Sequence, residues 1–294
     1  MEYGLCCLFK KENIKFKTFT LTNFSVEKAY EVYDHNIIEL QKAIDFCHLN
    51  KIKSYRVSSD ILPKFGKLHR EKKIEVEPYL NRLKEIDSYD LILSMHPDQF
   101  VNIGSPKDSV VSNSVEVVKD HILLSKYLKI SDINIHIGGS YGDKAETKKR
   151  FIENMLFNFN REELNLITIE NDEFNYSLDD TLEVAEKLSI RVTYDIHHER
   201  CFHLKSKKKV DETAEKENFF KARESWRGYG YQRVHLSSPR DGYTTPAKSR
   251  PHHDYIDIND FPKWLKEYDD VHIDIEAKAK ELAIKDLSET VSTL

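Results

Sequence analysis

The amino-acid sequence predicts an α/β protein built as a single (β/α)8 TIM barrel. Two observations point to this fold: eight short segments rich in β-branched and aromatic residues recur along the 294 residues, and long amphipathic segments separate most of them. Strands that alternate with helices imply parallel pairing, and eight such units suggest a closed barrel. No linker rich in Pro, Gly and Ser interrupts the chain, so we expect residues 1–294 to form one domain.

The eight predicted strands are short, as in parallel barrels. They are YGLCCLF from residue 3, KSYRVSS from 53, LILSMH from 91, INIHIGG from 133, LITIEND from 166, RVTYDIHH from 191, QRVHLSS from 232 and VHIDIEA from 271. Helical spacing marks residues 25–50, 112–129 and 144–160 between them. Ser177, with Asp180 three residues later, forms a capping box for the helix after the fifth strand, and Ser25 is a weaker cap. An open doubly wound sheet is the alternative, but no GxGxxG motif follows the first strand.

The charge of the chain limits its partners. Lys and Arg number 45 against 50 Asp and Glu, which gives a formal net charge of −5. A protein that coats nucleic acid through bulk charge is expected to have a pI above about 9. The mild acidity therefore excludes a general nucleic-acid coat, and any DNA binding must come from a defined site.

Other features indicate the compartment. The sequence has no run of about 18 apolar residues that would span a membrane, and its first 15 residues become charged too early for a secretory signal. The four cysteines are too few for a disulfide scaffold and form no CxxC pair. We expect a protein of the reducing cytoplasm without a membrane segment.

Six of the eight predicted strands end in or near a side chain that can bind a metal ion. These residues are His96, His136, Glu170, Asp195, His235 and Glu276. Strand C-termini of a barrel converge on one face, where the active sites of this fold lie, so we expect the six side chains to face one bowl. Carboxylates and imidazoles without cysteine suit Mn, Zn, Fe or Co rather than a thiolate zinc site.

These ligands are too many for one ion. A carboxylate such as Glu170 could bridge two ions about 3.5–4 Å apart, the spacing of two-metal hydrolases. His198 and His252 or His253, with Asp254, could complete a third ion, whereas His197 and His253 fit solvated loops equally well. Such a site would bind and hydrolyse a phosphodiester or isomerise a sugar, and strand register alone does not separate the two reactions.

Seven motifs in order resemble the UV damage endonucleases. They are RVSSDILP (56–63), HPDQF (96–100), HIGGSYGDK (136–144), IEND (169–172), DIHH (195–198), VHLSSPR (234–240) and IEAKAKELA (275–283). The resemblance implies a barrel whose metal arrangement is related to that of endonuclease IV. It implies a monomer that nicks damaged double-stranded DNA immediately 5′ to cyclobutane dimers and (6-4) photoproducts, with abasic sites as a further expected substrate, and leaves a 3′-hydroxyl for repair synthesis.

The resemblance also implies two or three divalent ions per chain, with Mn²⁺ as the usual metal and Zn²⁺ or Mg²⁺ as alternatives. One ion would be held by His96, His136 and Glu170. A second would be held by Glu170, Asp195, His235 and Glu276, which are also the expected catalytic residues. A third would be held by His198 and His252, with Asp254 as a further candidate.

The resemblance assigns DNA contacts as well. Gln99 and Phe100 look like the family's Gln-aromatic probe, which fills the gap left by the flipped-out lesion. A planar ring replaces lost stacking, and a photoproduct already stacks badly, so extrusion costs least at damage. The candidate phosphate partners are Arg56, Lys144 and Arg240. The basic run at 205–209 fits either a DNA-backbone contact or a solvated loop.

The chain departs from the family pattern at three points. Arg233 stands where the family usually has a Lys whose carboxylated form assists the metal site, so we expect the third ion to be bound more weakly or differently. Lys67 falls where the family often has His, with His69 two residues further on. The usual Gly-Tyr pair is Gly-Leu at 4–5, preceded by Tyr3.

Two other functions fit the residues. One is a sugar isomerase or epimerase on the same general barrel, which would need one or two ions and no exposed aromatic wedge. The other is a damage-binding relative that has lost turnover. The aromatic probe separates the first alternative from an endonuclease, and the retained Glu170 and Glu276 argue against the second.

Overall fold

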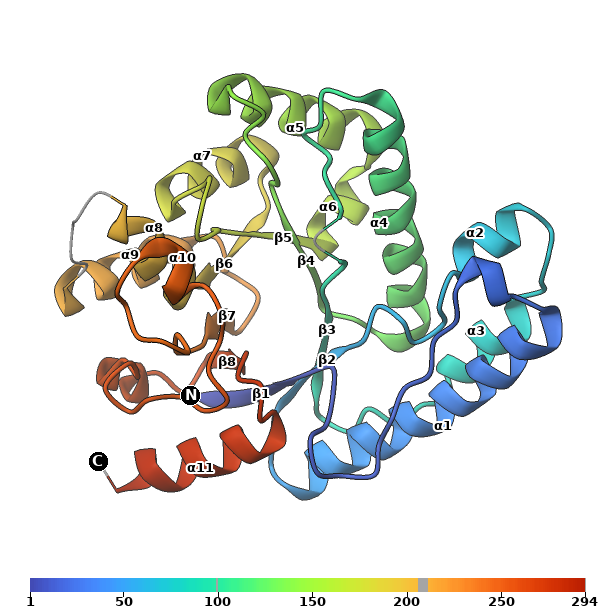
Figure 1. Ribbon diagram of the computed structural model, residues 1–294, viewed down its shortest axis with the longest axis horizontal. Helices are drawn as coiled ribbons and strands as arrows, with labels where there is room; N and C mark the ends of the chain where they lie inside the picture. The colour runs from blue at the N-terminus through green and yellow to red at the C-terminus, as the bar shows by residue number, and fades with distance from the viewer. Residues whose placement is uncertain (99, 206–210, 294) are drawn as a thin grey trace.

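Eight parallel strands close into a barrel in chain order, with β1 hydrogen-bonded to both β2 and β8 (Figure 1). The computed structural model describes residues 1–98, 100–205 and 211–293. The strands are β1 (Glu2–Cys6), β2 (Ser54–Val57), β3 (Ile92–Met95), β4 (Asp132–His136), β5 (Ile167–Glu170), β6 (Arg191–Asp195), β7 (Gln232–Leu236) and β8 (Val271–Ile275). Each predicted strand segment overlaps one of them, with β1 and β4 beginning one residue earlier than predicted, and the closed order of the strands confirms the (β/α)8 barrel.

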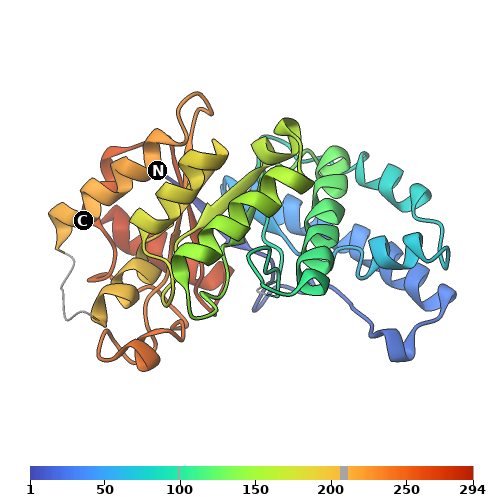
Figure 2. The same ribbon diagram turned by 90° about the horizontal axis from the view of Figure 1, so that it is seen from above.

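Helices surround the barrel in the order of the strands (Figures 1 and 2). They are α1 (Val26–Leu49), α2 (Phe65–Arg70), α3 (Glu77–Leu83), α4 (Asp108–Leu128), α5 (Lys144–Asn158), α6 (Arg161–Leu166), α7 (Leu178–Leu188), α8 (Ile196–Leu204), α9 (Glu212–Glu224), α10 (Pro246–Ser249) and α11 (Glu281–Ser292), with 3₁₀ turns η1 (Leu21–Asn23) and η2 (Lys263–Glu267). The three helices predicted from spacing are present as α1, α4 and α5. Among the described residues, no helix is long and apolar enough to cross a membrane.

The helix starts follow local capping chemistry. Ser177 and Asp180 form the predicted capping box of α7, and the Ser25 hydroxyl accepts from the backbone N–H of Lys28 at the start of α1. At the start of α8 the cap is Asp195, the last residue of β6, whose carboxylate accepts from the backbone N–H of His198 at 2.7 Å. One side chain therefore ends a strand, begins a helix and faces the barrel mouth.

The barrel interior is polar, and the apolar core lies between the strands and the helices. Arg233 on β7 contacts Asp132 on β4, and these strands are not neighbours, so the two side chains meet across the inside of the barrel. Side chains alternate along a strand, so Asn134 and His136 face the same way as Asp132. The outward-facing positions between them, Ile133 and Ile135, join the buried apolar cluster. Inward rows of polar residues thus lead up to the strand ends.

Candidate metal centre

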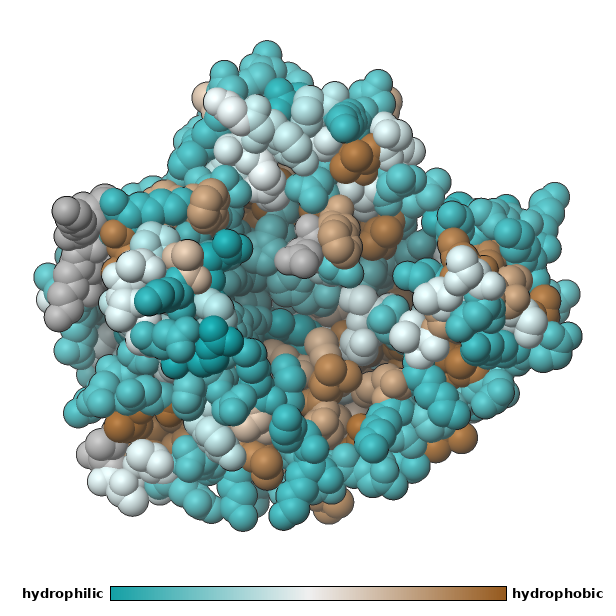
Figure 3. All heavy atoms as spheres, in the orientation of Figure 1, coloured by the Kyte–Doolittle hydropathy of each residue, from teal (hydrophilic) through white to brown (hydrophobic). Residues whose placement is uncertain are grey.

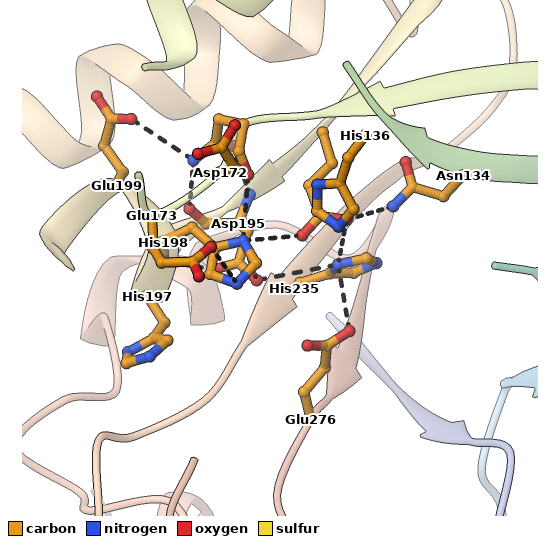
Figure 4. Close-up of polar contacts among 12 residues, drawn as sticks. Asn134, His136, Asp172, Glu173, Asp195, His197, His198, Glu199, His235 and Glu276 are labelled. Carbon is orange, nitrogen blue, oxygen red and sulfur yellow. Dashed lines mark hydrogen bonds and ion pairs between the residues drawn. The ribbon is translucent and has the colours of Figure 1, made fainter. Parts of the chain in front are cut away.

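The inward rows end in the six residues that the sequence singled out. His136, Glu170 and Asp195 are the last residues of β4, β5 and β6, and His235 is the last but one of β7. The remaining two, His96 and Glu276, follow directly after β3 and β8. Figure 4 shows five of the site's side chains, His136, Asp195, His198, His235 and Glu276, converging on one point. In the view of Figure 3 the molecule is hollowed at the centre of this face, and hydrophilic residues cover most of the wall.

Glu170 lies at the middle of the cluster. Its Oε2 is 3.4 Å from His96 Nε2, 4.0 Å from His136 Nε2 and 3.1 Å from His235 Nδ1. The carboxylate belongs to two groups whose ligand atoms lie within 4.8 Å of one another, one with His96 and His136 and one with Asp195 and His235. This is the arrangement in which one carboxylate can bridge two ions.

Three buried atoms of the cluster have no hydrogen-bond partner among the described residues. They are Nδ1 of His136, Nδ1 of His235 and Oδ2 of Asp195. Buried polar atoms are normally satisfied, because an unmade hydrogen bond costs about 1–3 kcal/mol. Nδ1 of His235 and Oδ2 of Asp195 lie 4.0 Å apart. An imidazole nitrogen and a carboxylate oxygen at this distance are a donor pair that a divalent cation satisfies, so the residues present fit a metal centre.

Two of the histidines are already oriented for ligation by backbone carbonyls. His96 Nδ1 is 2.9 Å from the carbonyl of Pro97, and His252 Nδ1 is 2.7 Å from the carbonyl of Glu276. A carbonyl only accepts, so Nδ1 carries the hydrogen in both rings and the lone pair is on Nε2. Such outer contacts fix the tautomer of metal-binding histidines.

The pKa values of two carboxylates in the cluster, Glu170 and Asp195, are shifted in opposite directions. Burial alone would raise the pKa of Glu170, but His235 and His136 hold it well below its usual range. The pKa of Asp195 is raised well above the ordinary value by burial, against a lowering by His198, and Glu170 and Glu276 raise it further. Burial also lowers the pKa of His136 to about 4, which leaves its ring neutral and able to donate a lone pair.

The neighbouring histidines of the DIHH motif take opposite directions (Figure 4). His198 Nδ1 lies 3.1 Å from Glu170 Oε1 and 3.4 Å from Asp195 Oδ2, inside the cluster. His197 is fully buried, with Nδ1 2.9 Å from the hydroxyl of Tyr243, so it is neither a cluster member nor a solvated loop residue.

The loop after β7 brings only part of its predicted set to the site. The rings of His252 and His198 are 6.4 Å apart, and His252 Nδ1 is 4.0 Å from Glu276 Oε2. His253 and Asp254 are exposed on the loop. Sequence reasoning missed Glu173, whose Oε2 lies 3.8 Å from His198 Nε2 (Figure 4). Glu173 lies three residues after Glu170, and this spacing could have identified it in the sequence.

Arg56 lies beneath the cluster rather than at its rim. Its guanidinium is 2.6 Å from Glu276 Oε1, 2.8 Å from His235 Nε2 and 3.1 Å from Asp274 Oδ2, and the residue is 7% exposed. The phosphate contact expected for Arg56 stays a prediction, but the structure gives this cation three partners inside the barrel.

The other expected DNA contacts lie on loops and helix starts. Lys144 begins α5, with Nζ 2.8 Å from Asp180 Oδ2, and half-exposed Arg240 pairs with Asp241. Phe100 is 75% exposed on the loop after β3. Gln99 lies outside the described residues, as do residues 206–209 of the basic run.

A second layer of charged residues lies below the ligands and was not expected from the sequence. Arg233 forms two contacts with Asp132, at 2.9 and 3.0 Å, and one with Asp274 at 2.9 Å. The Asn134 amide donates to Glu170, which fixes the central carboxylate from the same layer. Arg233, Asn134 and Asp274 are two positions before a ligand in the sequence, and Asp132 is four positions before one, so period-two alternation is the signal that identifies them.

Comparisons with known proteins identify relatives of the whole chain. The whole chain, residues 1–294, matches the family described as UV-endonuclease UvdE. UV DNA damage endonucleases of Nostoc sp. and Bacillus velezensis are 27% and 31% identical, over 97% and 88% of this chain and 89% and 81% of theirs. The crystal structure of SacUVDE superposes with a TM-score of 0.82 at 26% identity over 99% of both chains.

A more distant structure shares only the fold. Endonuclease IV from Thermus thermophilus superposes with a TM-score of 0.63 at 13% identity, over 100% of this chain and 98% of that one. The match over the full chain, together with the close similarity of the barrel, shows that this protein belongs to the UV-endonuclease UvdE family.

Proposed function

We propose that this UV-damage repair endonuclease is a metal-dependent phosphodiester hydrolase that nicks duplex DNA immediately 5′ to UV photoproducts and so starts an alternative excision repair. The proposed lesions are cyclobutane dimers, (6-4) photoproducts and abasic sites, and the product carries a 3′-hydroxyl. The observation that carries the proposal is Glu170, which joins two groups of ligand atoms at the C-terminal mouth of the barrel.

Two ions fit the residues best, with a third at a more open position. His96, His136 and Glu170 would hold one ion, and Glu170, Asp195, His235 and Glu276 a second. The third would have His198 and His252, whose rings are farther apart. Imidazole and carboxylate donors without thiolate suit Mn²⁺, with Zn²⁺ and Mg²⁺ as alternatives. When bound, such ions polarise a phosphodiester, activate water and stabilise the leaving oxygen.

The protein's own residues prepare the site for that chemistry. The neutral ring of His136 and the carbonyl-bound rings of His96 and His252 present lone pairs without competing protons. The low pKa of Glu170 keeps its carboxylate ionised at the centre of the cluster. Asp195 is held by the backbone N–H of His198, so its free oxygen keeps a fixed direction.

Damage recognition is proposed to rest on Phe100. The ring is exposed, while the residues on the same loop, Val101 and Ile103, are buried and anchor it. An anchored loop with one exposed aromatic ring suits insertion into a DNA stack, where a ring contributes about 1–3 kcal/mol per base. Gln99 would complete the probe. Lys144 and Arg240 would contact the phosphates of damaged duplex DNA, and the chain would act as a monomer.

Nicking of defined duplexes tests the proposal. The purified chain with Mn²⁺ should cut a duplex carrying a single cyclobutane dimer at the 5′ side of the lesion, and EDTA should stop the reaction. Glu170→Gln should abolish cutting because it removes the bridging charge, while Glu186→Gln, an exposed change on α7, should not. Cutting in EDTA, or full activity of Glu170→Gln, would contradict the mechanism.

The same experiment addresses the damage-binding alternative. A metal-loaded chain that binds the dimer and (6-4) duplexes but leaves both uncut would show recognition without turnover.

A further inference from the structure

Asp274 lies directly beside His235 in the layer under the proposed ions. The two residues are register partners on the adjacent strands β8 and β7, and both are fully buried. The distance from His235 Nε2 to Asp274 Oδ2 is 3.7 Å. The opposite nitrogen, Nδ1, faces Glu170, Asp195 and Glu276 at 3.1, 4.0 and 3.4 Å. The ring therefore stands between a ligand cluster on one side and a buried carboxylate on the other.

The Asp274 carboxylate is fixed from several sides. Oδ1 accepts from Arg233 at 2.9 Å, and Oδ2 accepts from Arg56 at 3.1 Å. Arg233 is itself held by Asp132 through two hydrogen bonds. On β1, a Cβ at Gly4 would lie 2.2 Å from Asp274 Oδ1, so only glycine leaves room for this carboxylate. These contacts give the Asp274 carboxylate a fixed position and direction beside His235.

The hydrogen bonding of His235 depends on which nitrogen binds a metal. The Arg56 guanidinium lies 2.8 Å from His235 Nε2, and a guanidinium can only donate. In the arrangement observed, Nε2 therefore accepts, and the ring hydrogen of the neutral imidazole is on Nδ1. A metal on Nδ1 needs the lone pair of that nitrogen. The hydrogen must then be on Nε2, where the nearby acceptor is Asp274 Oδ2.

We propose that Asp274 is a positioning residue that makes His235 a metal ligand by accepting its Nε2 hydrogen. The inference rests on the metal centre of the proposed function. When the ion binds, the N–H bond at Nδ1 is broken, one forms at Nε2, and the charge of the imidazole does not change. Arg56 then loses its hydrogen bond to His235 Nε2 and keeps those to Asp274 and Glu276. A movement of about 1 Å or less would shorten the distance between His235 Nε2 and Asp274 Oδ2 from 3.7 Å to that of a hydrogen bond.

Arg233 acquires a role in this arrangement. Carboxylates that accept from a metal-bound histidine orient the ring and raise its basicity. Here the carboxylate is held by Arg233, which Asp132 anchors from the far side of the barrel. The guanidinium at position 233 thus supports the ligand shell through Asp274.

The tautomer of His235 in the wild-type chain tests this directly. Ring nitrogens of ¹⁵N-histidine protein are correlated by NMR with and without Zn²⁺, and the His235 signals are assigned with His235→Gln. We expect the hydrogen on Nδ1 in the metal-free chain and a slowly exchanging hydrogen on Nε2 in the zinc-loaded chain. A loaded chain whose His235 Nε2 carries no hydrogen would overturn the proposal.

Zinc affinity provides a second readout. By calorimetric titration, Asp274→Asn should bind one Zn²⁺ about 10–100-fold more weakly than wild type, the usual effect of losing such a partner. The matched control is Asp120→Asn, which removes a carboxylate paired with Arg70 at 2.6 Å outside the barrel and should not change zinc binding. Unchanged zinc affinity in folded Asp274→Asn would overturn the proposal, and if that variant does not fold, the wild-type NMR result decides.

The outcomes separate this inference from the proposed function. A wild type that binds zinc with the expected His235 tautomer but does not nick DNA contradicts only the nuclease. One that nicks and binds zinc while Nε2 is unprotonated contradicts only the role of Asp274. A wild type that binds neither Zn²⁺ nor Mn²⁺ overturns both.

Discussion

Replacing Arg233 by Met should destabilise the fold markedly, because Arg233 is the main counterion of two buried carboxylates. The side chain is 1% exposed, and its partners Asp132 and Asp274 are fully buried. Breaking a buried ion pair by removing one partner costs about 3–5 kcal/mol, since the remaining charge stays in a poorly solvated place. Asp132 retains the hydroxyl of Tyr231 at 3.0 Å, and Asp274 retains Arg56. We therefore expect a loss near the lower limit, about 3 kcal/mol.

The assay is the free energy of unfolding in urea at pH 7 with EDTA, so that metal binding does not contribute. Arg70→Met is the matched control: Arg70 pairs with Asp120 but is 40% exposed, and exposed pairs contribute about 0–1 kcal/mol. In a double-mutant cycle, Asp132→Asn should reduce the cost of Arg233→Met by about 1–3 kcal/mol. If Arg233→Met loses no more than Arg70→Met, the layer under the site does not depend on charge pairing.

Three further predictions concern pH, lesion binding and metal. Burial lowers the pKa of His121 to about 4. The unfolded ring takes up a proton below about 6.5, so His121 should account for about 2 kcal/mol of the unfolding free energy that the wild type loses from pH 7 to pH 5. His121→Gln should make that loss smaller by about 2 kcal/mol, and exposed His69→Gln should not. Phe100→Ala should weaken binding to a dimer duplex about 5–150-fold in fluorescence anisotropy, from about 1–3 kcal/mol of stacking. Phe157→Ala, 87% exposed on α5, should have no effect. Mn²⁺ at about 100 times its Kd should raise the unfolding free energy by about 2.7 kcal/mol, and Glu170→Gln should lose most of that gain.

The fold and the ligand positions were accessible from the sequence because both follow from one periodicity. Eight β-rich segments alternate with amphipathic ones, and the metal-competent residues recur at the same end of those segments. In a closed parallel barrel that end is a single place, so the rings of His96 and His235 lie 6.3 Å apart although 139 positions separate them.

The directions of individual side chains were not accessible in the same way. In the DIHH motif, both histidines follow the strand, and only the capping of α8 by Asp195 places His198 in the cluster and His197 against Tyr243. Arg56 is of a residue type that often contacts phosphates. Its partners, however, depend on the register between β2, β1 and β8, which no local sequence pattern specifies.

Part of the negative charge behind the net charge of −5 lies in this centre. Glu170, Asp195 and Glu276 lie in one cluster, where Arg56 is paired with Glu276 and His198 lies beside Glu170 and Asp195. Burial raises the pKa of Asp195, and the neighbouring Glu170 and Glu276 raise it further. Under the proposed function, two divalent ions would add about four positive charges at the place where a phosphate must enter. An acidic chain would then bind DNA at one place, and the ions that supply the chemistry would also attract the substrate.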